Sequence, residues 1–86
     1  MRYSVNVVRG FYNDNGTIEK KQTQETFFDS IDSAVLCYRC SITGERVTGE
    51  LHSTEGSSNI HVKLYAWPNE GMTLLESVFL HNGEVQ

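Results

Sequence analysis

One stretch of the chain, residues 27–44 (FFDSIDSAVLCYRCSITG), has the periodicity of an amphipathic helix, whereas the segments on both sides of it alternate or turn. At 100° per residue, five apolar or aromatic side chains fall on one face about 100° wide, the width of a helix stripe that packs on a sheet: Ile31, Ala34, Val35, Tyr38 and Ile42. Asp29 or Ser30 can cap the first turn, and Asp32 suits the positive end of the helix dipole. Gly44 can adopt the left-handed conformation that ends a helix. The sequence therefore predicts a single helix over 27–44, on which the other segments must pack.

The segment before this helix predicts a hairpin. Residues 2–8 alternate polar and apolar side chains, as a strand with one buried side does, and Phe11-Tyr12 can continue it. Asn13-Asp14-Asn15-Gly16 is a strong turn signal, because Asn and Gly tolerate the positive φ angles of tight hairpins. The return strand, residues 17–27, is polar enough for a protected sheet edge.

Three more strands are expected after the helix, separated by turns at 55–58 and 68–71. Residues 46–54 form a weak strand interrupted by Gly49, residues 59–67 form the clearest strand, and residues 72–80 form a strand that is apolar on both faces. Residues 81–86 read as a frayed tail of a single domain that spans 1–86. The predicted fold is thus an α+β two-layer sandwich in the order β-β-α-β-β-β, with one helix on a mostly antiparallel five-stranded sheet.

One helix covers only part of one face of such a sheet, so the other face should meet water or a partner. In residues 59–67, one face is apolar, and the other carries His61, Lys63, Tyr65 and Trp67. In the last strand, Met72, Leu74, Val78 and Leu80 alternate with Leu75 and Phe79, so large apolar groups should remain on the uncovered side whichever face packs.

The helix also has an apolar side opposite its stripe, formed by Leu36, Cys37 and Cys40. This pattern indicates either a loop that folds over the helix or a contact surface. The residues predicted to bind a partner are Lys63, Tyr65, Trp67, Leu75, Phe79 and Leu36. Since two apolar surfaces offer self-contact, a homodimer is expected.

Cys37-Tyr38-Arg39-Cys40 is a C-x-x-C motif, and the chain has three histidines, so the ligand types of a zinc site are present. The weak candidate ligands are Cys37, Cys40, His52 and His61. Zinc signatures usually pair their ligands in close doublets, whereas these histidines are scattered singly. We therefore expect neither a metal nor another cofactor, and a zinc-stabilised domain is the third interpretation of the function.

Charge limits the classes of partner. The net charge is −4, and residues 44–86 hold two basic side chains against six glutamates. Excess acidity favours a basic protein partner over nucleic acid. The alternative is a single-stranded nucleic-acid-binding module, because the His61, Lys63, Tyr65 and Trp67 face has the aromatic and basic character on which bases stack. We expect no membrane contact, since no 18-residue apolar run occurs, and the alternating N-terminus favours the cytoplasm over secretion.

No catalytic motif is found, so the chain is not expected to be an enzyme. The leading prediction is a small non-enzymatic protein-binding domain. Its size, acidity and lack of a catalytic signature are loosely similar to accessory proteins of phages and mobile elements that bind and block one host protein. That similarity implies an inhibitor of a larger host protein or nucleoprotein complex, acting in the cytoplasm of the host cell.

Overall fold

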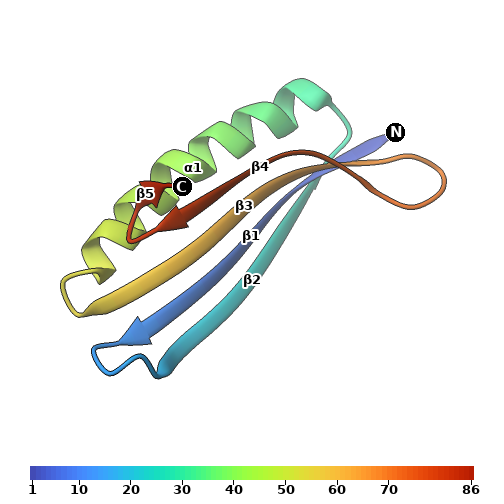
Figure 1. Cartoon of the computed structure of the whole chain (residues 1–86). Helices are drawn as coiled ribbons and strands as arrows, with labels where there is room; N and C mark the ends of the chain where they lie inside the picture. Colours follow the sequence, from blue (N-terminus) through green and yellow to red (C-terminus); the bar gives the residue numbers. More distant parts are fainter.

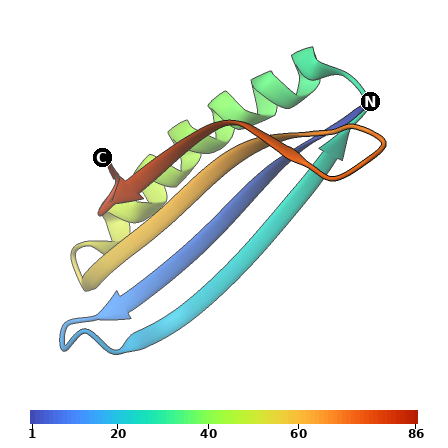
Figure 2. The same cartoon turned by 45° about the vertical axis from the view of Figure 1, so that its right-hand side comes forward.

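The computed structural model covers residues 1–86 and contains five strands and one helix: β1 (Arg2–Asn13), β2 (Ile18–Phe28), α1 (Ile31–His52), β3 (Gly56–Trp67), β4 (Thr73–His81) and β5 (Glu84–Val85). The strands form one sheet in the order β2-β1-β3-β4-β5, and all neighbours are antiparallel. The helix lies along one face of this sheet and leaves the other face without a covering layer (Figures 1 and 2). The predicted α+β class, with one helix on a five-stranded sheet, is confirmed.

The hairpin at the N-terminus forms as predicted. β1 and β2 pair along nearly their whole length, from Tyr3 opposite Phe28 to Tyr12 opposite Ile18. In the turn, Gly16 has a φ of +82° and its N–H donates to the carbonyl of Asn13 at 3.0 Å. The positive φ is the reason that a glycine stands there.

The helix is displaced and longer than predicted, and the strand expected over 46–54 does not exist. Ser30 is the N-cap, with its Oγ accepting from the N–H of Ser33 at 3.5 Å, and the helix ends at His52 rather than at Gly44. Residues 45–52 were misassigned because the buried positions there, Glu45 and Gly49, are not apolar. The apolar periodicity in the sequence therefore ends about a third of the helix length before the helix itself does.

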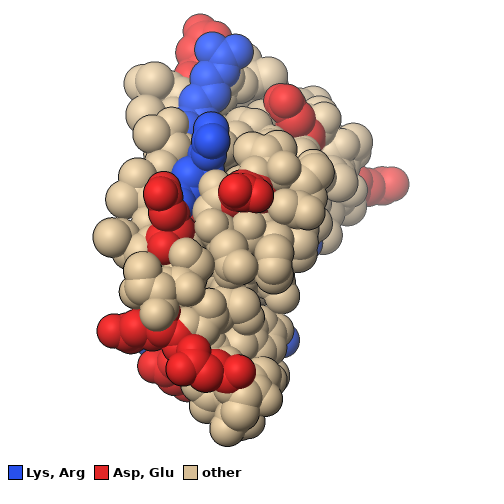
Figure 3. Space-filling model, turned by 60° about the vertical axis from the view of Figure 1, so that its left-hand side comes forward, with Lys and Arg blue, Asp and Glu red and all other residues tan.

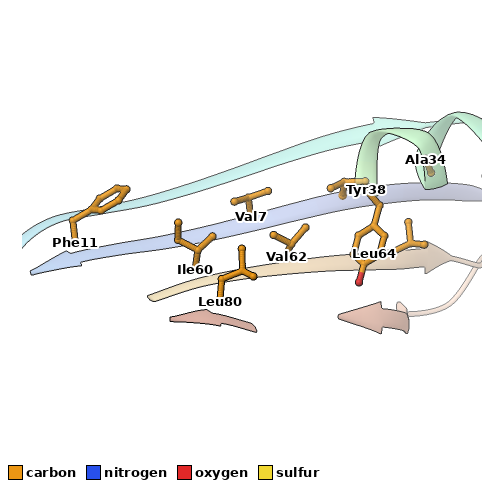
Figure 4. Close-up of a cluster of buried hydrophobic side chains, with 9 residues drawn as sticks. Val7, Phe11, Ala34, Tyr38, Ile60, Val62, Leu64 and Leu80 are labelled. Atoms are coloured by element: carbon orange, nitrogen blue, oxygen red, sulfur yellow. The ribbon is translucent and has the colours of Figure 1, made fainter. Parts of the chain in front are cut away.

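The core lies between α1 and the two central strands. Its nine buried members are Val5, Val7, Phe11, Ala34, Tyr38, Ile60, Val62, Leu64 and Leu80 (Figure 4). Of the predicted stripe, Ala34 and Tyr38 are buried and Val35 and Ile42 are partly buried, but Ile31 is exposed. The predicted face of the helix is therefore correct apart from its first residue.

The C-terminal residues are ordered in a strand rather than frayed. After a turn at Asn82-Gly83, β5 pairs with Leu80 and His81 at the edge of β4. This turn touches the helix so closely that a Cβ on Gly49 would lie 2.7 Å from the backbone nitrogen of Gly83. The missing side chain at Gly49 thus lets the last turns of α1 approach the end of the sheet.

Candidate functional site: the open face of the sheet

The candidate site is the face of the sheet that points away from α1, called the open face below. Strand alternation and register place on it these residues: Arg2, Ser4, Asn6, Val8 and Gly10 of β1; Lys21, Thr23, Glu25 and Phe27 of β2; Asn59, His61, Lys63, Tyr65 and Trp67 of β3; and Leu74, Ser77 and Phe79 of β4. Cross-strand rows connect them, so that Phe27, Ser4, Tyr65 and Leu74 lie side by side across four strands.

An aromatic cluster occupies one end of the open face. The ring of Trp67 lies 5.7 Å from that of Phe27 and 6.5 Å from that of Tyr65, between centroids. The Arg2 guanidinium sits over the Phe27 ring at 4.6 Å, a cation–π distance. Tyr65 and Trp67 are thus on the predicted face, and Phe27 and Arg2 join them there, which alternation within one strand does not predict.

Trp67 is held in place by a partly buried hydrogen bond. Its Nε1–H donates to Ser4 Oγ at 2.7 Å, and Ser4 in turn donates to Glu25 Oε2 at 3.0 Å. Ser4 is fully buried although it lies on the open face, because neighbouring open-face side chains cover it. Trp67 therefore supports the sheet as well as forming the surface, whereas Phe27 and Leu74 are exposed and free to contact a partner.

A bulge in β4 changes which of its side chains reach the open face. Val78 and Leu80 face the helix, but the register shifts between Leu64 and Tyr65, so that Leu74 pairs with Tyr65 on the open face. The expected grouping of Leu74 with Val78 and Leu80 is therefore wrong. Leu75 is the extra residue of the bulge and is exposed, as is Phe79, whose ring contacts that of His61 at 5.8 Å.

The other end of the open face contains a basic hollow of about 240 Å³. It is lined by Val8, Gly10, Tyr12, Lys21, Asn59, His61, Lys63 and Phe79, with no carboxylate among them. Burial, together with the charge of Lys63, lowers the pKa of His61, so its imidazole is neutral at pH 7. The hollow thus combines two ammonium groups with a neutral imidazole and the rings of Tyr12 and Phe79.

The open face has the opposite charge balance to the whole chain. Its register holds three cations, Arg2, Lys21 and Lys63, against the single carboxylate of Glu25, although the net charge of the protein is −4. On the side that Figure 3 shows, a short stripe of Lys and Arg has carboxylates on both sides. This separation is not visible in the two halves of the sequence, and the open face does not share the excess acidity from which a basic protein partner was expected.

The structure does not bring the candidate zinc ligands together. Cys37 is half-buried, with Sγ 3.8 Å from Ser41 Oγ, and Cys40 is exposed on the outer side of the helix. His52 contacts the carbonyl of Tyr12 through Nε2 at 3.1 Å, and His61 lies on the open face. No group of three or more His, Cys, Asp or Glu side chains has the geometry of a metal site.

Leu36, the last predicted partner-binding residue, lies far from the others, on the outer side of α1.

Comparison with protein-family models, curated proteins and solved structures finds no match for this chain. Its one helix does not have the length and apolarity that crossing a membrane requires.

Proposed function

We propose that this chain is a non-enzymatic protein-binding domain whose contact surface is the open face. The observation that carries the proposal is the row of Phe27, Tyr65 and Leu74 beside Trp67, because aromatic anchors ringed by polar groups dominate the energetics of protein interfaces. The exposed aliphatic side chains of Leu74 and Leu75 favour a protein over a nucleic acid, since bases stack on rings and gain little from aliphatic groups.

The charge of this face suggests the chemistry of the partner. Three cations around an apolar centre complement an acidic protein surface, and such complementarity raises association rates and orients the partner. A non-enzymatic binding domain acts by covering a surface of its partner and keeping other molecules from it. We therefore propose that it inhibits a larger host protein or nucleoprotein complex by covering an acidic patch, in the cytoplasm, where its two free cysteines stay reduced.

The test is capture of partners from extracts of the source organism by the immobilised chain, after nuclease treatment, followed by binding measurements with the purified partner. We expect Tyr65→Ala to weaken that binding at least about tenfold, as loss of an interface anchor does. Val85→Ala is the matched control, because Val85 is exposed on β5, away from the aromatic cluster. Equal binding by wild type and Tyr65→Ala would contradict the proposal.

A single-stranded nucleic acid is a second candidate ligand, favoured by the hollow that Lys21 and Lys63 line without a carboxylate. Its rings could stack on bases while the ammonium groups neutralise phosphates. Fluorescence anisotropy with labelled oligonucleotides of mixed sequence tests it at several salt concentrations. Lys21→Gln and Lys63→Gln should each reduce the slope of log K against log salt by about 1. No binding by the wild type at about 50 mM salt would reject this candidate.

A further inference from the structure

The outer side of α1 carries an apolar stripe that the open face does not use. Leu36, Val47 and Leu51 are 65%, 55% and 68% exposed, which is unusual for three large aliphatic groups on one helix. With the small exposed residues between them they form what we call the outer stripe: Leu36, Cys40, Thr43, Gly44, Val47 and Leu51. These six positions fall within an arc of about 100° opposite the buried Ala34, Tyr38, Glu45 and Gly49.

The outer stripe is symmetric about its own centre. Counting from the midpoint between Thr43 and Gly44, Leu36 stands as far to one side as Leu51 does to the other, and Cys40 corresponds to Val47 in the same way. Two antiparallel copies of the helix would therefore pack large groups against large groups at both ends. At the centre, Thr43 of each copy would face Gly44 of the other, where the missing side chain of glycine permits a close crossing.

From this self-complementarity we infer that the protein forms a homodimer through the outer stripe, with the two helices antiparallel about a two-fold axis at Thr43 and Gly44. A two-fold interface buries the same patch on both copies, and here it would place Leu36 of each copy against Leu51 of the other. A heterologous partner would not require the symmetry. The second copy is therefore the occupant that the pattern favours.

Charged residues on one flank of the stripe would meet across this arrangement. Arg39 and Glu50 lie on one flank of the stripe, and antiparallel pairing brings Arg39 of one copy to within about two residues, or about 3 Å along the axis, of Glu50 in the other. The two-fold axis makes two such pairs. Arg46, on the same flank, comes equally close to Arg39 of the other copy and lines a groove that also contains Glu50 and Glu84.

The size of the stripe predicts a weak dimer. From Leu36 to Leu51 the helix rises about 23 Å, and a contact of that length along a helix about 10 Å wide buries roughly 900 Å² in total. Stable complexes usually bury about 1,200 Å² or more, so we expect a dissociation constant of about 10–100 µM. The two helices would lie inside the dimer and the two open faces would point outward, so this interface and the proposed function are independent.

Sedimentation equilibrium or light scattering from about 5 to 500 µM tests the association over the range in which such a dimer forms. We expect Val47→Glu to raise the dissociation constant at least tenfold. The matched control is Val85→Glu, because Val85 is 54% exposed and Val47 55%, yet Val85 lies on β5 outside the stripe. A monomer at the highest concentration, or equal association of wild type and Val47→Glu, would overturn the inference.

A cysteine cross-link tests the orientation. In a Cys37→Ser variant that retains Cys40, Val47→Cys places a second thiol at the position that faces Cys40 of the antiparallel copy. Mild oxidation and peptide mapping should then give the 40–47 link between copies. Links of 40 to 40 and 47 to 47 would instead show parallel helices, and these or the absence of any cross-linked dimer would overturn the arrangement.

Discussion

The ion pair between Arg9 and Glu45 allows a quantitative test of how α1 is attached to the sheet. Arg9 Nε lies 2.8 and 2.9 Å from the two carboxylate oxygens of Glu45, and Nη2 also donates to Oε1. The side chains are only 18% and 9% exposed, so the pair lies largely between the layers. The hydrogen bonds that Arg9 donates to Glu45 raise the pKa of Arg9 above its usual value.

Glu45→Ala leaves this cation largely buried with no carboxylate partner, although Gln24 Oε1 still lies 3.4 Å from its Nη2. Breaking a fully buried pair costs about 3–5 kcal/mol. Because water still reaches part of Arg9, we expect a loss of about 2–3 kcal/mol from a total of about 4–13 kcal/mol for a chain of this length. The melting temperature should then fall by about 10–20 °C.

Urea denaturation of four proteins measures the pair directly: wild type, Glu45→Ala, Arg9→Met, and the double variant Arg9→Met/Glu45→Leu. We expect the double variant to be about as stable as the wild type, since apolar residues of similar volume often replace a buried pair without loss. If Glu45→Ala lowers the free energy of unfolding by less than about 1 kcal/mol, the pair behaves like a surface salt bridge and the reasoning is refuted.

Three further predictions concern single side chains. The hydroxyl of Tyr38 is buried without a hydrogen-bond partner, so Tyr38→Phe should raise the free energy of unfolding by about 1 kcal/mol in urea titrations, and a loss would contradict this. Gly44→Ala should stabilise by about 1 kcal/mol, because nothing lies near its added Cβ, whereas Gly49→Ala should destabilise despite the same gain in helix propensity; thermal melts at about 5 µM compare them. Burial and Lys63 lower the pKa of His61 below 6.5, so the unfolded chain binds more protons and stability should fall as the pH drops below 6.5. The urea midpoint of His61→Gln should change less between about pH 7.5 and 5.5 than that of the wild type.

The fold class was predictable because the alternation of apolar and polar side chains along the strands can be recognised in the sequence. β3 alternates buried and half-buried residues from Ser58 to Ala66 as the sequence indicates. The second half of α1 was not predictable, because its buried face continues through a charged residue whose partner, Arg9, is 36 positions away, and through Gly49, whose role depends on Gly83. Both depend on tertiary contacts that no periodicity within the helix can reveal.

The candidate site was predictable only in part, because some of its positions follow from one strand alone and others depend on how the strands pair. Alternation within one strand was sufficient to place Tyr65 and Trp67 on the open face. Phe27 and Lys21 were missed because their places follow from the β1–β2 register, and Leu74 was misplaced because a bulge moved it across the sheet. The local charge was misjudged for the same reason, since the sequence halves and the sheet faces divide the charged residues differently.

The distribution of apolar side chains connects the two proposed surfaces. Twelve large hydrophobic residues are exposed, whereas the buried hydrophobic set has ten members, two of them alanines. Some exposure is unavoidable in a chain this short, but scattered exposure would spread evenly over the surface. Here half of the exposed set lies on the two surfaces: Phe27, Leu74 and Phe79 share the open face, while Leu36, Val47 and Leu51 share the outer stripe. Because these surfaces lie on opposite sides of the same two layers, pairing through the helix leaves both open faces accessible, and one dimer would bind its acidic partner at two sites.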